Sequence, residues 1–138
     1  MAPLTNAQRR ELIQQASQVR QSAYAPYSRY QVGAALLCQD GRIFVGANVE
    51  NAAYPSSMCA ERVAVFTAVT AGARQFAAVV VATANGGTPC GGCRQVLAEF
   101  GLETIVILVD ETGRVVSETA LADLLPGAFL PKDLDSEK

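Results

Sequence analysis

Three cysteines and one glutamate stand at spacings typical of a catalytic zinc site. Cys59 precedes Glu61 by two residues, and Cys90 and Cys93 stand three apart further along the chain. Three thiolates can hold one Zn²⁺ and leave its fourth position open for water, which distinguishes a catalytic site from a closed structural one. Glu61, near the metal without being a ligand, could then move protons at that water. The pattern therefore predicts a catalytic zinc site.

The chain contains no histidine, so sulfur must hold any zinc and a His-based catalytic triad is excluded. Cys90 and Cys93 share one face of a predicted helix, and Cys59 falls in the first turn of another. Helix N-termini carry partial positive charge, which favours thiolate over thiol. Arg62 and Arg94 are each adjacent to the cluster, and we hypothesise that Arg62 donates hydrogen bonds to the sulfurs.

Two other interpretations of the cysteines remain open. A structural zinc site normally has four ligands, and Cys38 is the one cysteine left to supply the fourth. It ends a predicted strand without metal-type spacing to the others, which favours a core residue. A redox pair formed by Cys90 and Cys93 would leave Cys59 and Glu61 unexplained.

The composition predicts one globular domain over residues 1–138. Half of the residues are hydrophobic and 17% are charged, and the chain is long enough to bury a core. The net charge is −2, without a clustered basic face, so nothing indicates nucleic-acid binding. No apolar run approaches membrane-spanning length, and residues 1–6 lack the apolar region of a signal peptide. We therefore expect a cytoplasmic protein with reduced thiols and no membrane partner.

Periodicity and turn signals predict the elements that position the cluster. Thr5 and Gln8 form a capping box before an amphipathic N-terminal helix over about 5–22. Strands are predicted over 30–37, 43–48, 76–83, 104–109 and 114–117. Further helices are predicted from residue 55 to about 72, over 90–100 and over 120–125, with a charged C-terminal tail from about 132.

The order of these elements predicts an α/β fold, in which a mixed five-stranded sheet is covered by helices in three α-β-α layers. The helix ending near residue 72 is apolar nearly all round, which predicts that it is buried.

At these residues the chain resembles the zinc-dependent cytidine deaminase family, in its small homotetrameric type. The resemblance extends from about Leu12 to Leu130. The matching motifs are YAPYS at 24–28, VGAAL at 32–36, NVENA at 48–52, CAER at 59–62, PCGGCRQV at 89–96 and LLP at 124–126. It implies a cytidine deaminase-like fold, with one Zn²⁺ per subunit held by Cys59, Cys90 and Cys93 and with Glu61 as proton shuttle.

The resemblance implies an activity, the hydrolytic deamination of free cytidine and deoxycytidine to uridine and deoxyuridine plus ammonia, in pyrimidine salvage. Zinc-bound hydroxide would attack C4 of the ring while Glu61 transfers protons. A deaminase of another aminopyrimidine nucleoside and a non-catalytic structural zinc module are the alternatives. Polynucleotide deaminases of this superfamily usually carry a His ligand and additional nucleic-acid-binding elements; this chain has neither a histidine nor a basic stripe.

The resemblance also implies substrate contacts. Asn48 and Glu50 would hydrogen-bond the ribose, and two residues apart at a strand end they face the same side. Tyr30 matches an aromatic residue that contacts the base, where the family usually has Phe. In such homotetramers, neighbouring subunits complete each active site. The further positions that match substrate-binding residues are Ala60 and, reaching across from neighbours, Ala52, Tyr54 and Phe129.

Overall fold

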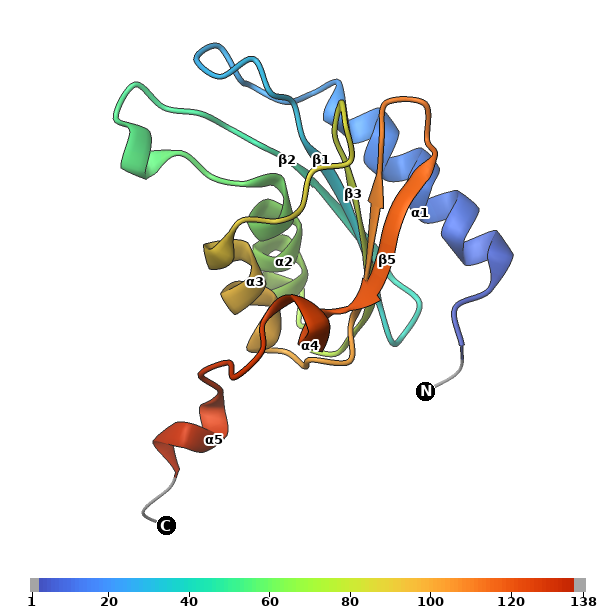
Figure 1. Cartoon of the computed structure of the whole chain (residues 1–138), viewed down its shortest axis with the longest axis vertical. Helices are drawn as coiled ribbons and strands as arrows, with labels where there is room; N and C mark the ends of the chain where they lie inside the picture. The colour runs from blue at the N-terminus through green and yellow to red at the C-terminus, as the bar shows by residue number, and fades with distance from the viewer. Residues whose placement is uncertain (1–2, 136–138) are drawn as a thin grey trace.

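The computed structural model describes residues 3–135, which form three layers around one mixed sheet (Figure 1). The elements are α1 (Asn6–Arg20), β1 (Gly33–Cys38), β2 (Ile43–Ala47), the 3₁₀ turn η1 (Tyr54–Ser56), α2 (Ala60–Thr70), β3 (Phe76–Ala82), α3 (Gly91–Ala98), β4 (Ile105–Val109), β5 (Val115–Ala120), α4 (Leu121–Leu124) and α5 (Pro131–Leu134). The capping box at Thr5 and Gln8 begins α1 as expected. The predicted fold class is confirmed.

The sheet order brings three strand ends to one edge. The order is β2-β1-β3-β4-β5, with β3 and β4 parallel and the other pairs antiparallel. Gly33 at the start of β1 lies opposite both Ala47 and Ala82, the last residues of β2 and β3. Ligands of open α/β sheets bind outside the carboxyl ends of parallel strands. The N-termini of α2 and α3 lie at this same edge.

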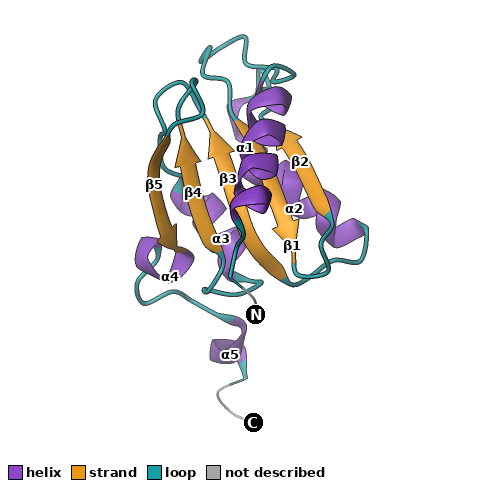
Figure 2. Cartoon of the chain, turned by 90° about the vertical axis from the view of Figure 1, so that its right-hand side faces the viewer, coloured by secondary structure: helices purple, strands orange, loops and turns teal. Residues whose placement is uncertain are grey.

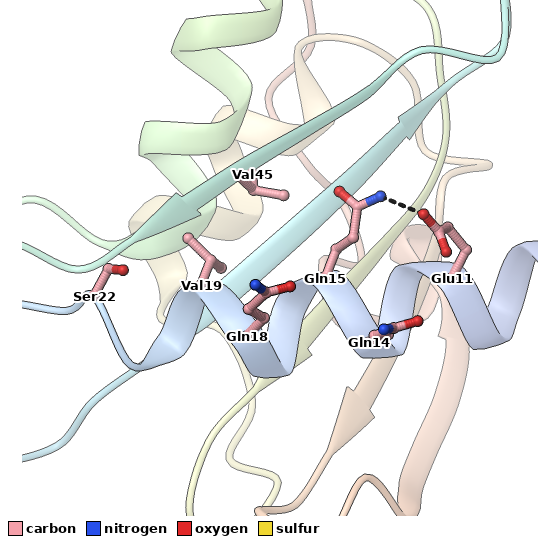
Figure 3. A pocket seen from close by; sticks show the side chains of 7 residues that line it. All are labelled: Glu11, Gln14, Gln15, Gln18, Val19, Ser22 and Val45. Carbon is pink, nitrogen blue, oxygen red and sulfur yellow. Dashed lines mark hydrogen bonds between the residues drawn. The ribbon is translucent and has the colours of Figure 1, made fainter.

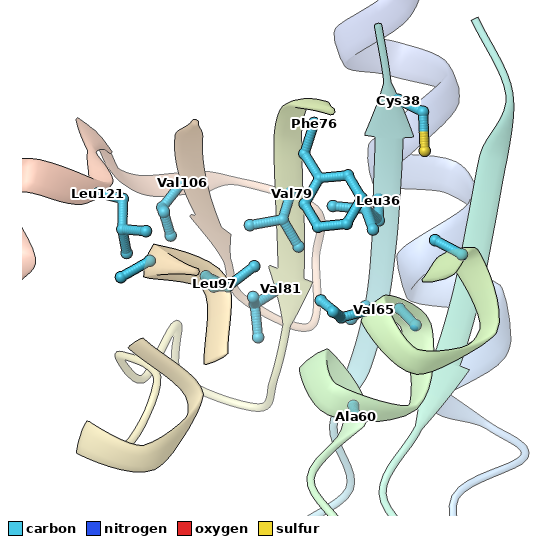
Figure 4. Packing of buried hydrophobic residues seen from close by; sticks show 14 of the residues in the cluster. Leu36, Cys38, Ala60, Val65, Phe76, Val79, Val81, Leu97, Val106 and Leu121 are labelled. Carbon is cyan, nitrogen blue, oxygen red and sulfur yellow. The ribbon is translucent and has the colours of Figure 1, made fainter. Parts of the chain in front are cut away.

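Helices cover both faces of the sheet (Figure 2). On one face, Leu12 and Ala16 of α1 pack on Ala35, Val80 and Ile107. On the other face, α2 and α3 enclose a larger cluster that includes Phe76, Val65 and Leu97 (Figure 4). Strand β1 is buried along its whole length, as expected for a strand covered on both sides.

Strand β1 begins three residues later than predicted, at Gly33. The side chain of Asn48 forms hydrogen bonds with backbone groups of the residues just before β1. Its Oδ1 accepts from the Val32 N–H at 2.8 Å, and its Nδ2 donates to the Tyr30 carbonyl at 2.9 Å. These groups therefore bond to a side chain instead of a strand ladder. Strand β5 is longer than predicted and continues to Ala120.

Helix α2 begins later than predicted. Pro55 occupies the first turn of η1, a short 3₁₀ turn in which proline is tolerated, and the chain is then extended up to Cys59. Cys59 is thus the N-cap of α2 and does not lie within its first turn. The prediction that this helix is buried all round is wrong for the single chain, because Phe66 is 43% exposed.

A glycine sets how closely α2 approaches the sheet. A Cβ at Gly46 of β2 would lie 2.6 Å from both the Ala60 carbonyl oxygen and the Ala64 nitrogen. Any larger residue would push the first turn of α2 outward. Gly46 therefore allows the start of α2, with Glu61 in its first turn, to sit against the sheet.

At the C-terminus, residues Pro131–Leu134 of the predicted charged tail form one helical turn, α5, which projects from the body of the molecule (Figure 1). Residues 136–138 of that tail lie outside the described residues, as do residues 1–2 of the segment examined for a signal peptide. Across residues 3–135, no helix has the length and apolar character needed to cross a membrane.

Candidate functional site

The three predicted cysteine ligands come together at the N-termini of two helices. Cys59 is the N-cap of α2, Cys90 is the N-cap of α3, and Cys93 lies in the first turn of α3. The Cys90 sulfur lies 4.0 Å from that of Cys59 and 3.4 Å from that of Cys93, and all three lie within 4.8 Å of one another. Sulfurs that share one tetrahedral zinc at ~2.3 Å lie about 3.8 Å apart. The cluster therefore fits a single zinc ion.

The electrostatics of the cluster favour a bound cation. The pKa of Cys59 is lowered to about 6, first by its hydrogen bond with Cys93 and then by the charge of Arg62, against the effect of burial. The pKa of Cys93 is raised, because its hydrogen bond with Cys59 and its burial both favour the thiol. Three thiolates at this spacing repel one another, so positive charge among them lets all three ionise together.

Arg62 supplies part of that positive charge. Its Nη2 donates to the Cys90 sulfur at 3.6 Å, and hydrogen bonds to Cys93 and Cys90 raise the pKa of its guanidinium. Its Nε is buried without a hydrogen-bond partner among the described residues. Arg94, the other candidate, instead donates to the carbonyls of Pro89 and Leu124, both at 2.8 Å. Arg62 is therefore the arginine that faces the sulfurs.

Glu61 is a buried carboxyl beside the cluster. Only 5% of its surface is exposed, and burial is the main cause that raises its pKa, with the negative charge of Cys59 adding to the effect. A raised pKa makes the ionised carboxylate a stronger base. Burial therefore perturbs the pKa of Glu61 in the direction that a proton-accepting group requires.

A cavity of about 310 Å³ opens in front of the cluster. Cys59, Ala60, Glu61 and Cys90 line it, together with the predicted substrate contacts Tyr30, Asn48 and Glu50. Among residues 3–135, no lysine or arginine lines this cavity. The fold thus brings residues from before β1, after β2, the start of α2 and the start of α3 into one small space.

Glu50 is held by the loop that precedes β1. Its Oε1 accepts from the backbone N–H groups of Tyr27 and Ser28, both at 3.0 Å, and the Ser28 hydroxyl donates to Oε2. The Ser28 hydroxyl and the two N–H groups lower the pKa of Glu50, so the group is ionised at neutral pH. Ser28 has no role in the predicted site, although it ends the YAPYS motif.

Three of the predicted contacts do not line the cavity. Tyr54 lies in an adjoining groove, where its ring meets that of Tyr27 edge-on with centroids 5.8 Å apart. The groove shares Ser28, Glu50 and Ser57 with the cavity. Ala52 and Phe129 line neither space, and Phe129 is 58% exposed.

The segment that leads to Cys90 contains polar residues for which the sequence carries no signal. Tyr30 donates from its hydroxyl to Asn85 Oδ1 at 2.8 Å, and buried Thr83 accepts from the N–H groups of Gly86 and Gly87. Asn85 and Thr83 stand in a loop whose glycines indicate only a turn. Their pairing with Tyr30 depends on the packing of segments far apart in the chain.

Cys38, the one candidate for a fourth thiolate, lies elsewhere. It is buried in the core with Phe76 at the opposite end of β1 (Figure 4). Within residues 3–135, the cysteine group close enough to share an ion consists of Cys59, Cys90 and Cys93. The structural-zinc interpretation therefore lacks its fourth protein ligand.

A further cavity between α1 and β2 has a different character (Figure 3). Three of its seven described lining residues are glutamines, and Gln15 donates to Glu11 at 2.7 Å. Its described lining residues include the carboxylate of Glu11 and no cysteine, and the cavity lies on the α1 side of the sheet, away from the three cysteines.

Comparisons with known proteins agree with this geometry. The family model for the cytidine and deoxycytidylate deaminase zinc-binding region matches residues 6–109. A cytidine deaminase of Sporosarcina psychrophila is 46% identical over 126 residues, which covers 90% of this chain and 93% of the relative. A cytidine deaminase of Halalkalibacterium halodurans is 44% identical, with 92% of this chain and 98% of the relative covered.

A solved structure is similar in both sequence and fold. The crystal structure of cytidine deaminase from Burkholderia pseudomallei has a TM-score of 0.82 and 47% identity to this chain. The match covers 87% of this chain and 98% of that one.

Proposed function

Because the chain belongs to the cytidine and deoxycytidylate deaminase family, we propose that it hydrolyses free cytidine and deoxycytidine to uridine and deoxyuridine plus ammonia, as an enzyme of pyrimidine salvage. The observation that carries the proposal is the shared cavity of about 310 Å³, which is lined by Cys59, Cys90 and Glu61 together with Asn48 and Glu50. Metal-ligating, acid–base and sugar-binding groups thus face one nucleoside-sized space.

Cys59, Cys90 and Cys93 would hold the zinc ion. When bound, Zn²⁺ would act as a Lewis acid that lowers the pKa of a water molecule. Glu61 takes a proton from the attacking water on a carboxylate oxygen and delivers it toward the leaving amino group, so that water and cytidine become uridine and ammonia. Its burial supports this role, because a raised pKa eases return of the proton.

Asn48 and Glu50 orient the sugar. The Asn48 amide keeps one N–H and one lone pair beyond its two backbone hydrogen bonds, which suits a hydroxyl group. Glu50 is fixed by Tyr27 and Ser28 and accepts from sugar hydroxyls as an anion. Tyr30 and Ala60 line the space left for the base.

Charge favours a nucleoside over a nucleotide. Glu50 is ionised at the cavity, and no lysine or arginine of the described part of the chain lines the cavity or the adjoining groove. A 5′-phosphate would meet a carboxylate without a compensating cation. The net charge of −2 likewise does not favour the binding of a polynucleotide.

The active protein is a homotetramer in the cytoplasm, in which neighbouring subunits complete each site through Ala52, Tyr54 and Phe129. Large exposed apolar side chains support an assembly; they include Tyr54, Phe66 and Phe129. Three reduced thiols are required for the metal, which suits a reducing compartment. Sedimentation of the zinc-loaded protein tests the assembly, and a monomer would contradict it.

The deciding experiment is ammonia release from cytidine by the purified, zinc-loaded protein, with cytidine monophosphate and other aminopyrimidine nucleosides as a panel. We expect release from cytidine and deoxycytidine that a chelator abolishes. Release from another aminopyrimidine alone would replace the substrate, and no release from any, with zinc in four-thiolate coordination, would favour a structural zinc module.

A further inference from the structure

We infer that Asn85 is a positioning residue, which holds the Tyr30 ring at the edge of the cavity and joins it to the segment leading to Cys90. The inference rests on the proposed function, in which Tyr30 forms part of the base pocket. Tyr30 lies before β1 and Asn85 lies after β3, 55 positions apart, yet the Tyr30 hydroxyl donates to Asn85 Oδ1 at 2.8 Å.

The network around Asn85 uses every hydrogen-bonding position of two oxygens. Asn85 Oδ1 accepts from Tyr30 and, at 3.3 Å, from the Thr83 hydroxyl. Thr83 Oγ1 in turn accepts from the N–H groups of Gly86 at 2.7 Å and Gly87 at 2.9 Å. A hydroxyl has one donor and two lone pairs, and a carbonyl oxygen has two lone pairs. Both oxygens are therefore saturated, and a change at Tyr30 is transmitted to the backbone of 86–87.

Packing fixes the same segment from its other side. A Cβ at Gly86 would lie 2.5 Å from a methyl carbon of Val116 on β5. Asn85 also forms a backbone bridge to Asp110 at the end of β4. The segment is thus anchored on β4 and β5, and Asn85 extends that anchor to Tyr30.

Gly87 gives the Tyr30 hydroxyl the space that it occupies. A Cβ at Gly87 would lie 2.5 Å from the Tyr30 hydroxyl oxygen, 3.4 Å from Asn85 Oδ1 and 3.7 Å from Tyr30 Cζ. The last two are ordinary contacts, so the hydroxyl alone excludes a side chain at position 87. It could yield only by swinging the ring and breaking its bond to Asn85. A side chain at position 87 would therefore displace the Tyr30 hydroxyl from its place beside Asn85.

The test is a pair of substitutions whose effects depend on each other. We expect Gly87→Ala alone to raise the KM for cytidine by at least about tenfold, through the displaced Tyr30 ring, while kcat changes less than KM. In the Tyr30→Phe background, where the clashing oxygen is absent, Gly87→Ala should change KM by less than about twofold. Equal effects of Gly87→Ala in the two backgrounds would overturn the inference.

The role of Asn85 Oδ1 as the acceptor for the Tyr30 hydroxyl is tested by comparing a variant that removes the oxygen with one that keeps it. Asn85→Ala should raise KM about three- to tenfold, the range expected for one lost hydrogen bond. Asn85→Asp keeps an oxygen acceptor for Tyr30 and should recover most of the loss. In the Tyr30→Phe background, Asn85→Ala should add little. Tyr24→Phe, which removes a hydroxyl from an exposed tyrosine outside the cavity, is the matched control and should leave KM unchanged.

A readout without activity separates this inference from the proposed function. Tyr30→Phe should speed amide hydrogen exchange at Gly86 and Gly87, whose N–H groups bond to Thr83, with zinc content unchanged. If wild type releases no ammonia, the proposed function fails while exchange still decides the coupling. Unchanged amide hydrogen exchange at Gly86 and Gly87 in Tyr30→Phe would contradict the coupling. The coupling would also be contradicted if Gly87→Ala failed to fold both with Tyr30 and with Phe at position 30.

Discussion

The guanidinium of Arg62 lies against the sulfur of Cys90, 28 positions further along the chain, with Nη2 and Sγ 3.6 Å apart. Arg62 stands in the first turn of α2, and Cys90 is the N-cap of α3. The contact therefore ties together the two helices that supply the metal ligands. It also places a fixed positive charge beside thiolates, which otherwise leave a zinc site with a net charge near −1.

Replacing Arg62 should weaken metal binding. We expect Arg62→Ala to lower zinc affinity by about 10- to 100-fold, the usual cost of removing a group that hydrogen-bonds a metal ligand, with activity falling as well. Competition with a chromogenic chelator measures the affinity. Arg74→Ala, at an exposed loop residue, is the control and should bind zinc like wild type. Full zinc affinity and activity in Arg62→Ala would remove the proposed role.

Replacing Glu61 should separate chemistry from folding. Glu61→Ala and Glu61→Gln should keep one zinc per subunit and lose at least ~10²–10⁴-fold in turnover, the range for general acid–base catalysis. Gln has nearly the shape of Glu and removes a charge that burial disfavours, so the melting temperature should not fall. Metal analysis, calorimetry and ammonia release report the three quantities. Near-normal turnover would show that another group transfers the proton.

Removing the metal should loosen the start of α2 and α3. Without the cation, the sulfur–metal bonds that would join Cys59 to Cys90 are absent, and metal binding to such sites is coupled to folding. We therefore expect a chelator to lower the melting temperature and added zinc to restore it. The chelator already saturated with zinc is the control. Identical melting with and without zinc would argue against the coupling.

The loop hydroxyl at Ser28 should set the ionisation of Glu50. The Ser28 hydroxyl is the first cause that lowers the pKa of Glu50 below its ordinary value of 4.5, followed by the Ser28 N–H. In Ser28→Ala, the pKa should rise toward 4.5, as measured by carboxyl-carbon NMR titration.

The lowered pKa of Glu50 makes the effect of Ser28→Ala on protein stability depend on pH. A carboxyl group whose pKa is lower in the folded than in the unfolded protein stabilises the fold at a pH above the unfolded-state pKa. That stabilisation is lost as the pH falls through the folded-state pKa. Ser28→Ala should therefore reduce stability at neutral pH and differ little from wild type in acid. Ser22→Ala, outside the Glu50 loop, should leave the Glu50 titration unchanged; an equal shift there would refute the assignment to Ser28.

Asn48 should matter for folding as well as for substrate. Asn48→Ala leaves the Val32 N–H and the Tyr30 carbonyl without their partner, so the free energy of unfolding should fall by about 1–3 kcal/mol. KM for cytidine should rise in the same variant. Denaturant unfolding measures the first effect. Asn51→Ala, at an exposed residue whose Oδ1 accepts from the Ala53 N–H, should cost less; equal losses would deny Asn48 its structural role.

Some elements could be predicted because their signals are local. The capping box at Thr5 and Gln8 and the β-branched run of β3 specify a helix start and a central strand through nearby residues. The start of α2 could not, since Pro55 suits the first turn of a 3₁₀ segment as well as that of an α-helix. The start of β1 could not be predicted either, because the side chain of Asn48, which is distant in sequence, forms hydrogen bonds with the backbone just before the strand.

By itself, the sequence determined the chemistry of the site. Three cysteines without a histidine, and a glutamate two residues after the first of them, indicate a thiolate zinc site with an acid–base group, because ligand type and spacing follow from residue identity. Only the tertiary structure decided which arginine faces the sulfurs, that Ser28 fixes Glu50, and that Tyr30 bonds Asn85. Those relationships join segments far apart in the chain, and their geometry exists only after the sheet and its helices have packed.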